Sequence, residues 1–247
     1  MKKIKIFLVF GTRPEEIKMA PLIKELQLRE EFDTIVCVTA QHRQMLDQVL
    51  SFFEITPQYD LNIMKDRQTL DSITRKTLEL LTPILQKEQP DIVLVHGDTT
   101  TSFASALAAF YEKITIGHVE AGLRTWNKYS PFPEEANRQM VDCLSELFFA
   151  PTEKSACNLR NEGKVQGIYV TGNTAIDALK LTVSKDYHHP ILEEQKNNRI
   201  LLLTAHRREN LGKPMEDIFR AVKRVVNEYS DISVIYPIHM NPAIREI

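Results

Sequence analysis

The amino-acid sequence predicts an α/β fold in which doubly wound parallel sheets carry helices on both faces. Short apolar runs of strand length alternate along the chain with amphipathic segments of helix length. This alternation is typical of buried parallel strands joined by helical crossovers. The pattern restarts near Gly172, so we expect a first domain at residues 1–172 and a second at 173–247. A chain of 247 residues is long enough to bury a core in this way.

The first strand and helix follow from the opening residues. Ile4–Phe10 is an uninterrupted apolar run apart from one lysine, which favours a buried strand. A helix is expected after the turn that follows and extends to about Arg29. Pro14 suits its first turn, where the helix dipole favours Glu15 and Glu16.

The remaining elements are expected in the same alternating order. The residues 59–67 show no period and are interpreted as a loop, and 186–198 as a linker. Further helices are expected where apolar residues recur at helical spacing, at 42–53, 70–89, 99–111, 134–144, 152–161, 173–185 and 213–229. Further strands are expected at 34–39, from Asp91, from Ile114, and at 147–150, 168–171, 200–204 and 232–236.

Composition excludes several classes of protein. The 31 basic and 33 acidic residues give a net charge of −2 without a long basic run, which argues against nucleic acid as a partner. The first apolar run is too short for a signal peptide or a membrane span, so we expect a cytoplasmic protein without membrane partners. The three cysteines show no CxxC spacing, which argues against disulfides and zinc, and Cys37 is expected in the core.

Polar clusters follow two neighbouring strands in the region 90–138. His96 and Asp98 follow the first strand, His118 and Glu120 close the second, and a loop then leads to Glu134. The carboxyl ends of parallel strands form the edge at which open α/β sheets bind ligands. We therefore expect Asp98, Glu120 and Glu134 to converge there.

Each carboxylate has a structural alternative of different strength. Asp98 precedes three threonines and is a good candidate helix N-cap. Glu134 follows a proline and is equally compatible with a first-turn acid. Glu120 has no such structural explanation. If Glu120 and Glu134 lie close together, repulsion and burial should raise one pKa and leave the other carboxylate ionised, which yields an acid and a base.

Two groups of cations are candidate anion sites. Arg13 and Lys18 lie where a strand gives way to a helix, the usual place for a phosphate, although the GxGxxG pattern of dinucleotide sites is missing. The alternative is two solvated charges on a surface helix. His206, Arg207 and Arg208 follow a strand of the second domain and suit a phosphate or a sugar, although a polar surface loop explains them as well.

Eight ordered motifs, spread over essentially the whole chain, closely resemble those of the bacterial non-hydrolysing UDP-N-acetylglucosamine 2-epimerases. They are GTRPEEIKMAPL, TAQHRQMLDQVL, HGDTTTSFASALAAFY, GHVEAGLRT, SPFPEEANRQ, VTGNTAIDAL, TAHRREN and YPIHMNP. The resemblance implies a GT-B architecture, with two Rossmann-like domains and the nucleotide sugar between them. It also implies a homodimer that interconverts UDP-N-acetylglucosamine and UDP-N-acetylmannosamine for surface polysaccharide or teichoic acid, without metal or redox cofactor.

The resemblance also assigns roles to individual residues of this sequence. In the mechanism it implies, a base removes the C2 proton while UDP leaves C1, and UDP adds back to 2-acetamidoglucal after reprotonation on the other face. The implied catalytic and substrate-binding positions are Arg13, Lys18, Asp98, Glu120, Glu134 and His206, with Arg207 expected beside them. The implied site for a second, activating UDP-N-acetylglucosamine comprises Gln41, Gln44, Arg67, Glu134, Arg208 and His239.

Other functions remain open at this stage. A GT-B glycosyltransferase or a hydrolysing epimerase would share the fold and the sugar nucleotide, and a non-catalytic binding module is a third class. The resemblance further implies that family members continue for about half a domain. We therefore expect residues 1–172 to carry most of the fold, residues 173–247 to be mobile or docked on a partner chain, and the 247-residue chain to have little activity alone.

Overall fold

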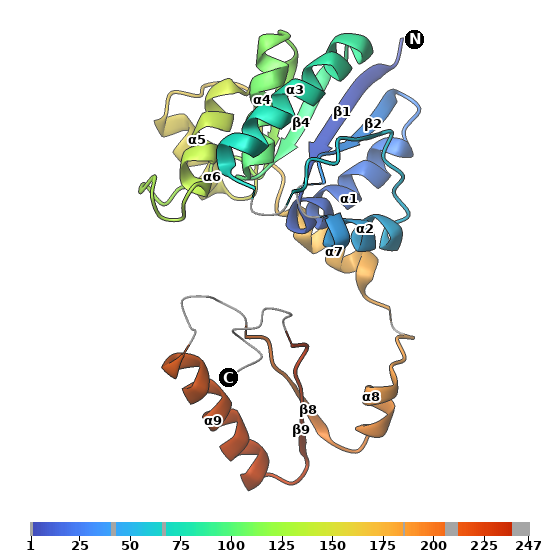
Figure 1. Ribbon diagram of the computed structural model, residues 1–247, viewed down its shortest axis with the longest axis vertical. Coiled ribbons are helices and arrows are strands. Elements are labelled where there is room, and N and C mark those ends of the chain that lie inside the picture. Colours follow the sequence, from blue (N-terminus) through green and yellow to red (C-terminus); the bar gives the residue numbers. More distant parts are fainter. Residues whose placement is uncertain (1, 41–42, 66–67, 185, 206–211, 239–247) are drawn as a thin grey trace. The chain divides into compact units, whose positions relative to one another are not determined.

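The chain forms two compact units, Met1–Thr182 and Val183–Ile247 (Figure 1). The computed structural model describes residues 2–40, 43–65, 68–184, 186–205 and 212–238. The predicted boundary at residue 172 differs from this division, because helix α7 (Thr174–Thr182) packs against α1 (Arg13–Gln27) in the first unit. Ala178 of α7 is buried in the core beside α1.

The first unit is built on a parallel sheet of seven strands. Their order across the sheet is β3-β2-β1-β4-β5-β6-β7, and every neighbouring pair is parallel. The strands are β1 Ile4–Phe10, β2 Phe32–Val38, β3 Tyr59–Asp60, β4 Ile92–His96, β5 Thr115–Val119, β6 Leu147–Ala150 and β7 Ile168–Val170.

Helices cover both faces of this sheet, as the sequence predicts (Figure 1). Besides α1 and α7 they are α2 Arg43–Phe52, α3 Leu70–Glu88, α4 Thr100–Tyr111, α5 Glu134–Leu144 and α6 Glu153–Asn161. Alternate residues of β1 enter different cores: Leu8 packs with α1 and α2, whereas Val9 packs with α3 and α4. Cys37 of β2 is fully buried, which confirms its predicted place in the core.

Two short elements were not predicted. Strand β3 lies in the expected loop at 59–67 and pairs with the end of β2 through two residues, too few to show a period. Helix α8 (Pro190–Glu194) lies in the expected linker, where His189 caps it by accepting a hydrogen bond from the Ile191 amide. Both depend on a local partner rather than on a repeating apolar pattern.

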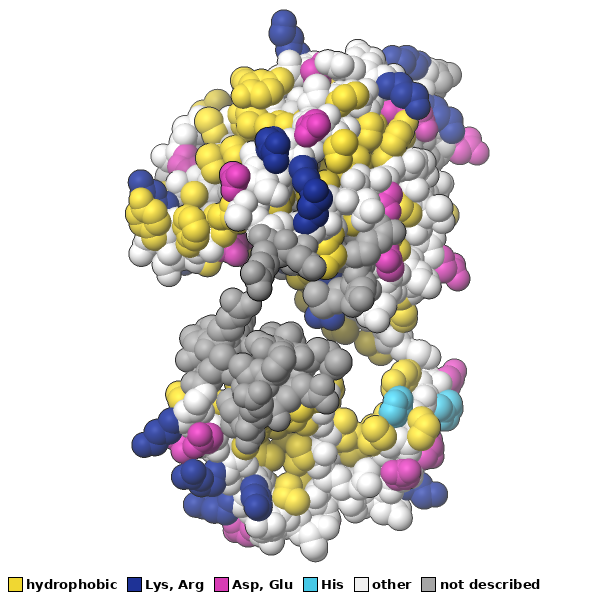
Figure 2. All heavy atoms as spheres, in the orientation of Figure 1, with side chains coloured by type: hydrophobic (Ala, Val, Ile, Leu, Met, Phe, Trp, Pro, Cys, Tyr) yellow, Lys and Arg dark blue, Asp and Glu magenta, His cyan; other side chains and the backbone are white. Residues whose placement is uncertain are grey.

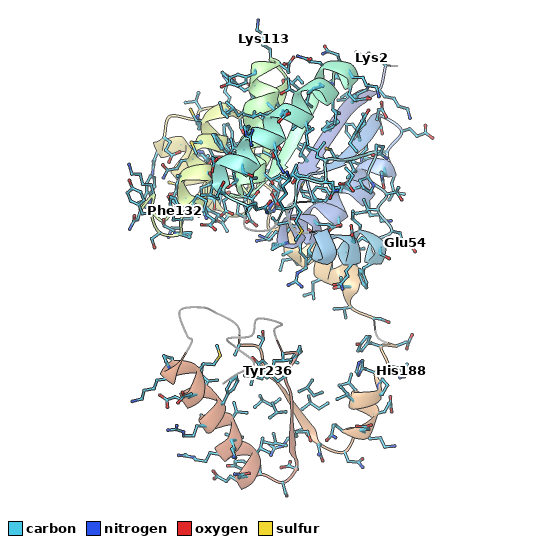
Figure 3. All side chains as sticks on the ribbon, viewed as in Figure 1. Lys2, Glu54, Lys113, Phe132, His188 and Tyr236 are labelled. Carbon is cyan, nitrogen blue, oxygen red and sulfur yellow. The ribbon has the colours of Figure 1, made fainter. Side chains whose placement is uncertain are left out.

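The second unit is much smaller in its described part. Strands β8 (Arg199–Leu202) and β9 (Ile232–Ile235) are parallel and are joined by α9 (Lys213–Glu228). Tyr236, after β9 (Figure 3), donates from its hydroxyl to the Ala205 carbonyl. Met215 is the sole buried hydrophobic residue among those of this unit that are described. The predicted fold class, two Rossmann-like α/β units of which the second has few strands here, is therefore confirmed.

Candidate active site

The candidate site lies where the strand order of the large sheet reverses direction. Strands β1 and β4 are neighbours, but α1 leaves β1 toward one face of the sheet and α4 leaves β4 toward the other. Such a switch point leaves a crevice outside the carboxyl ends of the strands. The predicted polar clusters after β4 and β5 lie at this edge, next to the start of α1.

Glu120 and Lys18 form an ion pair at this edge. The Lys18 Nζ lies 2.5 Å from Glu120 Oε2, and Asn173 Nδ2 donates to the same oxygen at 3.3 Å. The Glu120 side chain is 12% exposed. Its backbone adopts φ = +68°, a left-handed conformation that costs energy in a residue with a Cβ. The amides of Glu120 and Ala121 both donate to the Phe149 carbonyl, which holds this conformation in place.

Asp98 binds an arginine and does not cap α4. The N-cap is Thr99, whose hydroxyl accepts from the Ser102 amide at 3.0 Å. The Asp98 carboxylate instead accepts from Arg138 of α5, and its main-chain carbonyl accepts from Asn137 Nδ2 at 2.9 Å. The capping interpretation of Asp98 is therefore wrong, and the carboxylate is part of the edge that faces the crevice.

The two acids at the start of α5 have different environments. Glu134 stands in the first turn, as its structural alternative predicts, and its Oε2 is buried without a hydrogen-bond partner among the described residues. Glu135 is fully buried, accepts from the Trp126 amide at 3.0 Å and lies 3.3 Å from Arg138. Burial alone would raise the pKa of Glu135, but these hydrogen bonds and Arg138 lower it. The expected pKa difference between Glu120 and Glu134 stays a prediction.

Glu15 joins the start of α1 to the start of α4. One carboxylate oxygen accepts from the Gly11 and Thr12 amides at 3.1 and 2.8 Å, and the other from the Thr99 and Ser102 hydroxyls at 2.6 and 2.8 Å. From the sequence, only a favourable interaction of Glu15 with the helix dipole was expected. The spacing Thr12-x-x-Glu15 is a capping-box signal that identifies it.

A buried charge network lies behind the site and was not predicted. His118 of β5 contacts Asp142 Oδ1 through Nδ1 at 2.6 Å and the Gly97 carbonyl through Nε2 at 2.8 Å. Both partners are acceptors, which fits a ring with hydrogen on both nitrogens. Burial would raise the pKa of Asp142, but His118 and Arg124 lower it. The network thus anchors Gly97, the residue between His96 and Asp98.

His96 is buried at the end of β4 and has an unusual environment. Its residue exposure is 3%, and its Nε2 lies 3.8 Å from Glu120 Oε2, without a hydrogen-bond partner in the part of the chain that is described. Burial, helped by the positive charges of Lys18 and His118, lowers its pKa to about 3. The ring is therefore neutral near pH 7.

This geometry can be compared with that of known proteins. Residues 24–247 match the family model described as UDP-N-acetylglucosamine 2-epimerase. The chain belongs to this family. The UDP-N-acetylglucosamine 2-epimerase of Bacillus subtilis strain 168 is 60% identical over 247 residues, which are 100% of this chain and 65% of that protein. The chain thus spans about two thirds of the length of such relatives.

Solved structures of family members agree with the fold. The structure of S. aureus MnaA with UDP is 56% identical, with a TM-score of 0.87 over 98% of this chain and 65% of its own. The Neisseria meningitidis UDP-GlcNAc 2-epimerase bound to UDP-GlcNAc is 50% identical, with a TM-score of 0.86 over 98% and 68%. Within the described residues, no helix is both long enough and apolar enough to cross a membrane.

The other residues expected for an epimerase of this family are only partly described. Arg13 is the first residue of α1 and is exposed. It lines a groove of about 500 Å³ formed by α1, α2 and α7. Gln44 lies in α2, and its side chain is not described. Outside the described residues lie Gln41, Arg67, His206, Arg207, Arg208 and His239.

Proposed function

We propose that the protein containing this chain is a non-hydrolysing UDP-N-acetylglucosamine 2-epimerase, which interconverts UDP-N-acetylglucosamine and UDP-N-acetylmannosamine. The observation that carries the proposal is the contact of Lys18 with Glu120 at the switch point of the sheet. A phosphate-binding cation and a proton-accepting carboxylate there suit a reaction that breaks a bond to phosphate and moves a proton. The Neisseria relative, solved with UDP-GlcNAc, supports this substrate.

The proposed reaction is redox-neutral and uses the chain's own side chains. Arg13, Lys18 and the amino-terminal end of α1 bind the pyrophosphate. A carboxylate of the pair Asp98 and Glu120 removes the C2 proton as the C1–O bond breaks, which gives UDP and 2-acetamidoglucal. Reprotonation of C2 from the other face and return of UDP to C1 complete the epimerisation, for which Glu134 is the third available acid.

The remaining assignments complete the proposal. We infer that His206 and Arg207 stabilise the charge of the departing UDP. A second UDP-N-acetylglucosamine binds as an activator at Gln41, Gln44, Arg67, Glu134, Arg208 and His239. The enzyme is a cytoplasmic homodimer that supplies sugar for surface polysaccharide or teichoic acid.

Proton NMR in deuterated water tests the reaction. With the full-length protein and UDP-N-acetylglucosamine, and with no NAD or metal added, deuterium should enter C2 of both sugar nucleotides. Retention of the C2 hydrogen would contradict the mechanism. Free N-acetylmannosamine with UDP would indicate a hydrolysing epimerase, and transfer of the sugar to an acceptor would indicate a glycosyltransferase.

Substitution of the two carboxylates tests their roles. Glu120→Gln and Asp98→Asn should each lower turnover at least about a hundredfold, the usual scale for loss of a general acid or base. Asn caps helices as well as Asp does, but Asp98 contacts Arg138 and the cap is Thr99. Thr99→Ser keeps the capping hydroxyl and is the control. Near-normal turnover of Asp98→Asn would remove Asp98 from the mechanism.

A further inference from the structure

His96 has a buried ring nitrogen near the candidate site that makes no hydrogen bond with the described residues. The residue is 3% exposed, and Nε2 has no hydrogen-bond partner among the described residues. Leaving such an atom unpaired is unfavourable, so buried polar atoms are normally hydrogen-bonded. The nearest charged oxygen is Glu120 Oε2 at 3.8 Å, about 1 Å beyond hydrogen-bonding distance.

The same oxygen is already occupied by Lys18. The Lys18 Nζ lies 2.5 Å from Glu120 Oε2. This ion pair holds the carboxylate oxygen beside the ammonium group. Under the proposed function Lys18 also binds the substrate pyrophosphate, whose greater charge competes for the ammonium group. Among the described residues, Glu120 Oε2 then keeps only the Asn173 amide, at 3.3 Å, as a hydrogen-bond donor.

We propose that His96 is a positioning residue for Glu120, whose carboxylate moves from Lys18 to the imidazole Nε2–H when Lys18 binds the substrate phosphate. This inference rests on the proposed function. A shift of about 1 Å closes the contact, which a rotation of the Glu120 carboxylate provides. The neutral ring carries one hydrogen, and donation to Glu120 requires that hydrogen on Nε2.

The surroundings keep the ring neutral during this exchange. The charged groups that face His96 are Glu120 at 3.8 Å, Lys18 from α1 and His118 from β5. Burial and the last two hold the pKa of His96 near 3. Asp98 is bound by Arg138, and Asp142 is bound by His118 and Arg124. Neither carboxylate is therefore available to stabilise a protonated His96 ring.

Steady-state kinetics of the full-length protein with UDP-N-acetylglucosamine test the role. We expect His96→Phe to lower kcat about tenfold or more, the scale of one hydrogen bond, with KM changed less than about threefold. His96→Gln retains an N–H donor and should recover part of this loss. The acid limb of the kcat profile should move to higher pH in His96→Phe, because the carboxylate that accepts the proton loses a hydrogen-bond donor.

Matched controls separate positioning from stability. Thr77→Val removes another buried, unpartnered polar atom, on α3, and should leave kcat and the pH profile unchanged. If His96→Phe keeps the wild-type kcat and acid limb, or His96→Gln recovers nothing, the inference is wrong while the proposed function stands. Absence of epimerisation in the wild type would instead overturn the proposed function.

A ligand titration of the wild-type protein tests the same inference if the His96 variants do not fold. Nitrogen NMR of the His96 ring in the wild-type protein should show a neutral ring down to about pH 5 and a shift of Nε2 when UDP is added, since UDP draws Lys18 from Glu120. An Nε2 signal unaffected by saturating UDP would overturn the exchange of partners.

Discussion

Two arginine–aspartate pairs show how differently the two units use charge. Arg124 and Asp142 in the first unit are 2.6 Å apart, and neither side chain has any exposure. Arg199 and Asp231 in the second unit make two hydrogen bonds of 2.6 and 2.9 Å, but the side chains are 65% and 55% exposed. Both pairs join a guanidinium group to a carboxylate, but only the first is buried. Only this buried pair helps to organise a site.

The contrast follows from the number of strands that can bury a side chain. Seven strands with helices on both faces enclose the first unit's core, whereas two described strands leave the second unit's sheet largely open. Figure 2 shows hydrophobic side chains at the surface around β8 and β9. Leu202 and Ile200 of β8 are 70% and 42% exposed. A sheet of so few strands is marginal unless it packs on something else.

The largest expected effect concerns the buried Glu16 of the first unit. Burial, with a smaller contribution from Asp47, raises its pKa from 4.5 to about 9. The folded state then keeps a proton that the unfolded chain releases, so Glu16 makes stability fall as pH rises from about 5 to 9. Between these pH values, Glu16 lowers the free energy of unfolding by about 1.4 kcal/mol per pH unit. The position of Glu16 in the first turn of α1 is as predicted.

Glu16→Gln should remove this slope. We expect the variant to unfold at higher urea than the wild type at pH 8, by on the order of 4 kcal/mol, and to differ little at pH 4. Unfolding is followed by fluorescence of the single tryptophan, Trp126, which lies in the first unit. Glu30→Gln replaces an exposed acid near the same helix and should retain the wild-type slope. Equal slopes in wild type and Glu16→Gln would show that Glu16 is ionised in the fold.

The next effect tests the two ion pairs directly. Arg124→Met leaves the buried Asp142 with one cation fewer and should cost about 3–5 kcal/mol. Arg199→Met breaks an exposed pair and should cost less than about 1 kcal/mol. Trp126 fluorescence measures the first variant, and hydrogen exchange of β8 and β9 measures the second. Similar losses in both would mean that burial does not distinguish the pairs.

The smallest effect compares one leucine from each sheet. Leu94 of β4 is 5% exposed, so Leu94→Ala should cost about 2–5 kcal/mol. Leu202 of β8 is 70% exposed, and Leu202→Ala should change stability by less than about 0.5 kcal/mol. Thermal unfolding and hydrogen exchange give both values. A cost at Leu202 near that at Leu94 would show that the open face is covered in solution.

The sequence by itself determined the layers of the first unit and the edge where its polar residues gather. Apolar runs and amphipathic segments are local patterns, so strands such as Ile4–Phe10 and helices such as Leu70–Glu88 are found where predicted. Placing Asp98 and Glu120 at one edge needed only the rule that parallel strands end together. No comparable rule places the side chains of a loop. Phe132, in the loop before α5, is apolar and yet exposed (Figure 3).

Only the tertiary structure decided which partners these residues have. Lys18 meets Glu120 across 102 positions of sequence, Arg138 meets Asp98 across 40, and His118 meets Asp142 across 24. A carboxylate pattern does not reveal whether its neighbour in space is a helix cap, a cation or another acid. The partner, and with it the protonation state of each group, is set by packing between elements that the chain brings together only when it folds.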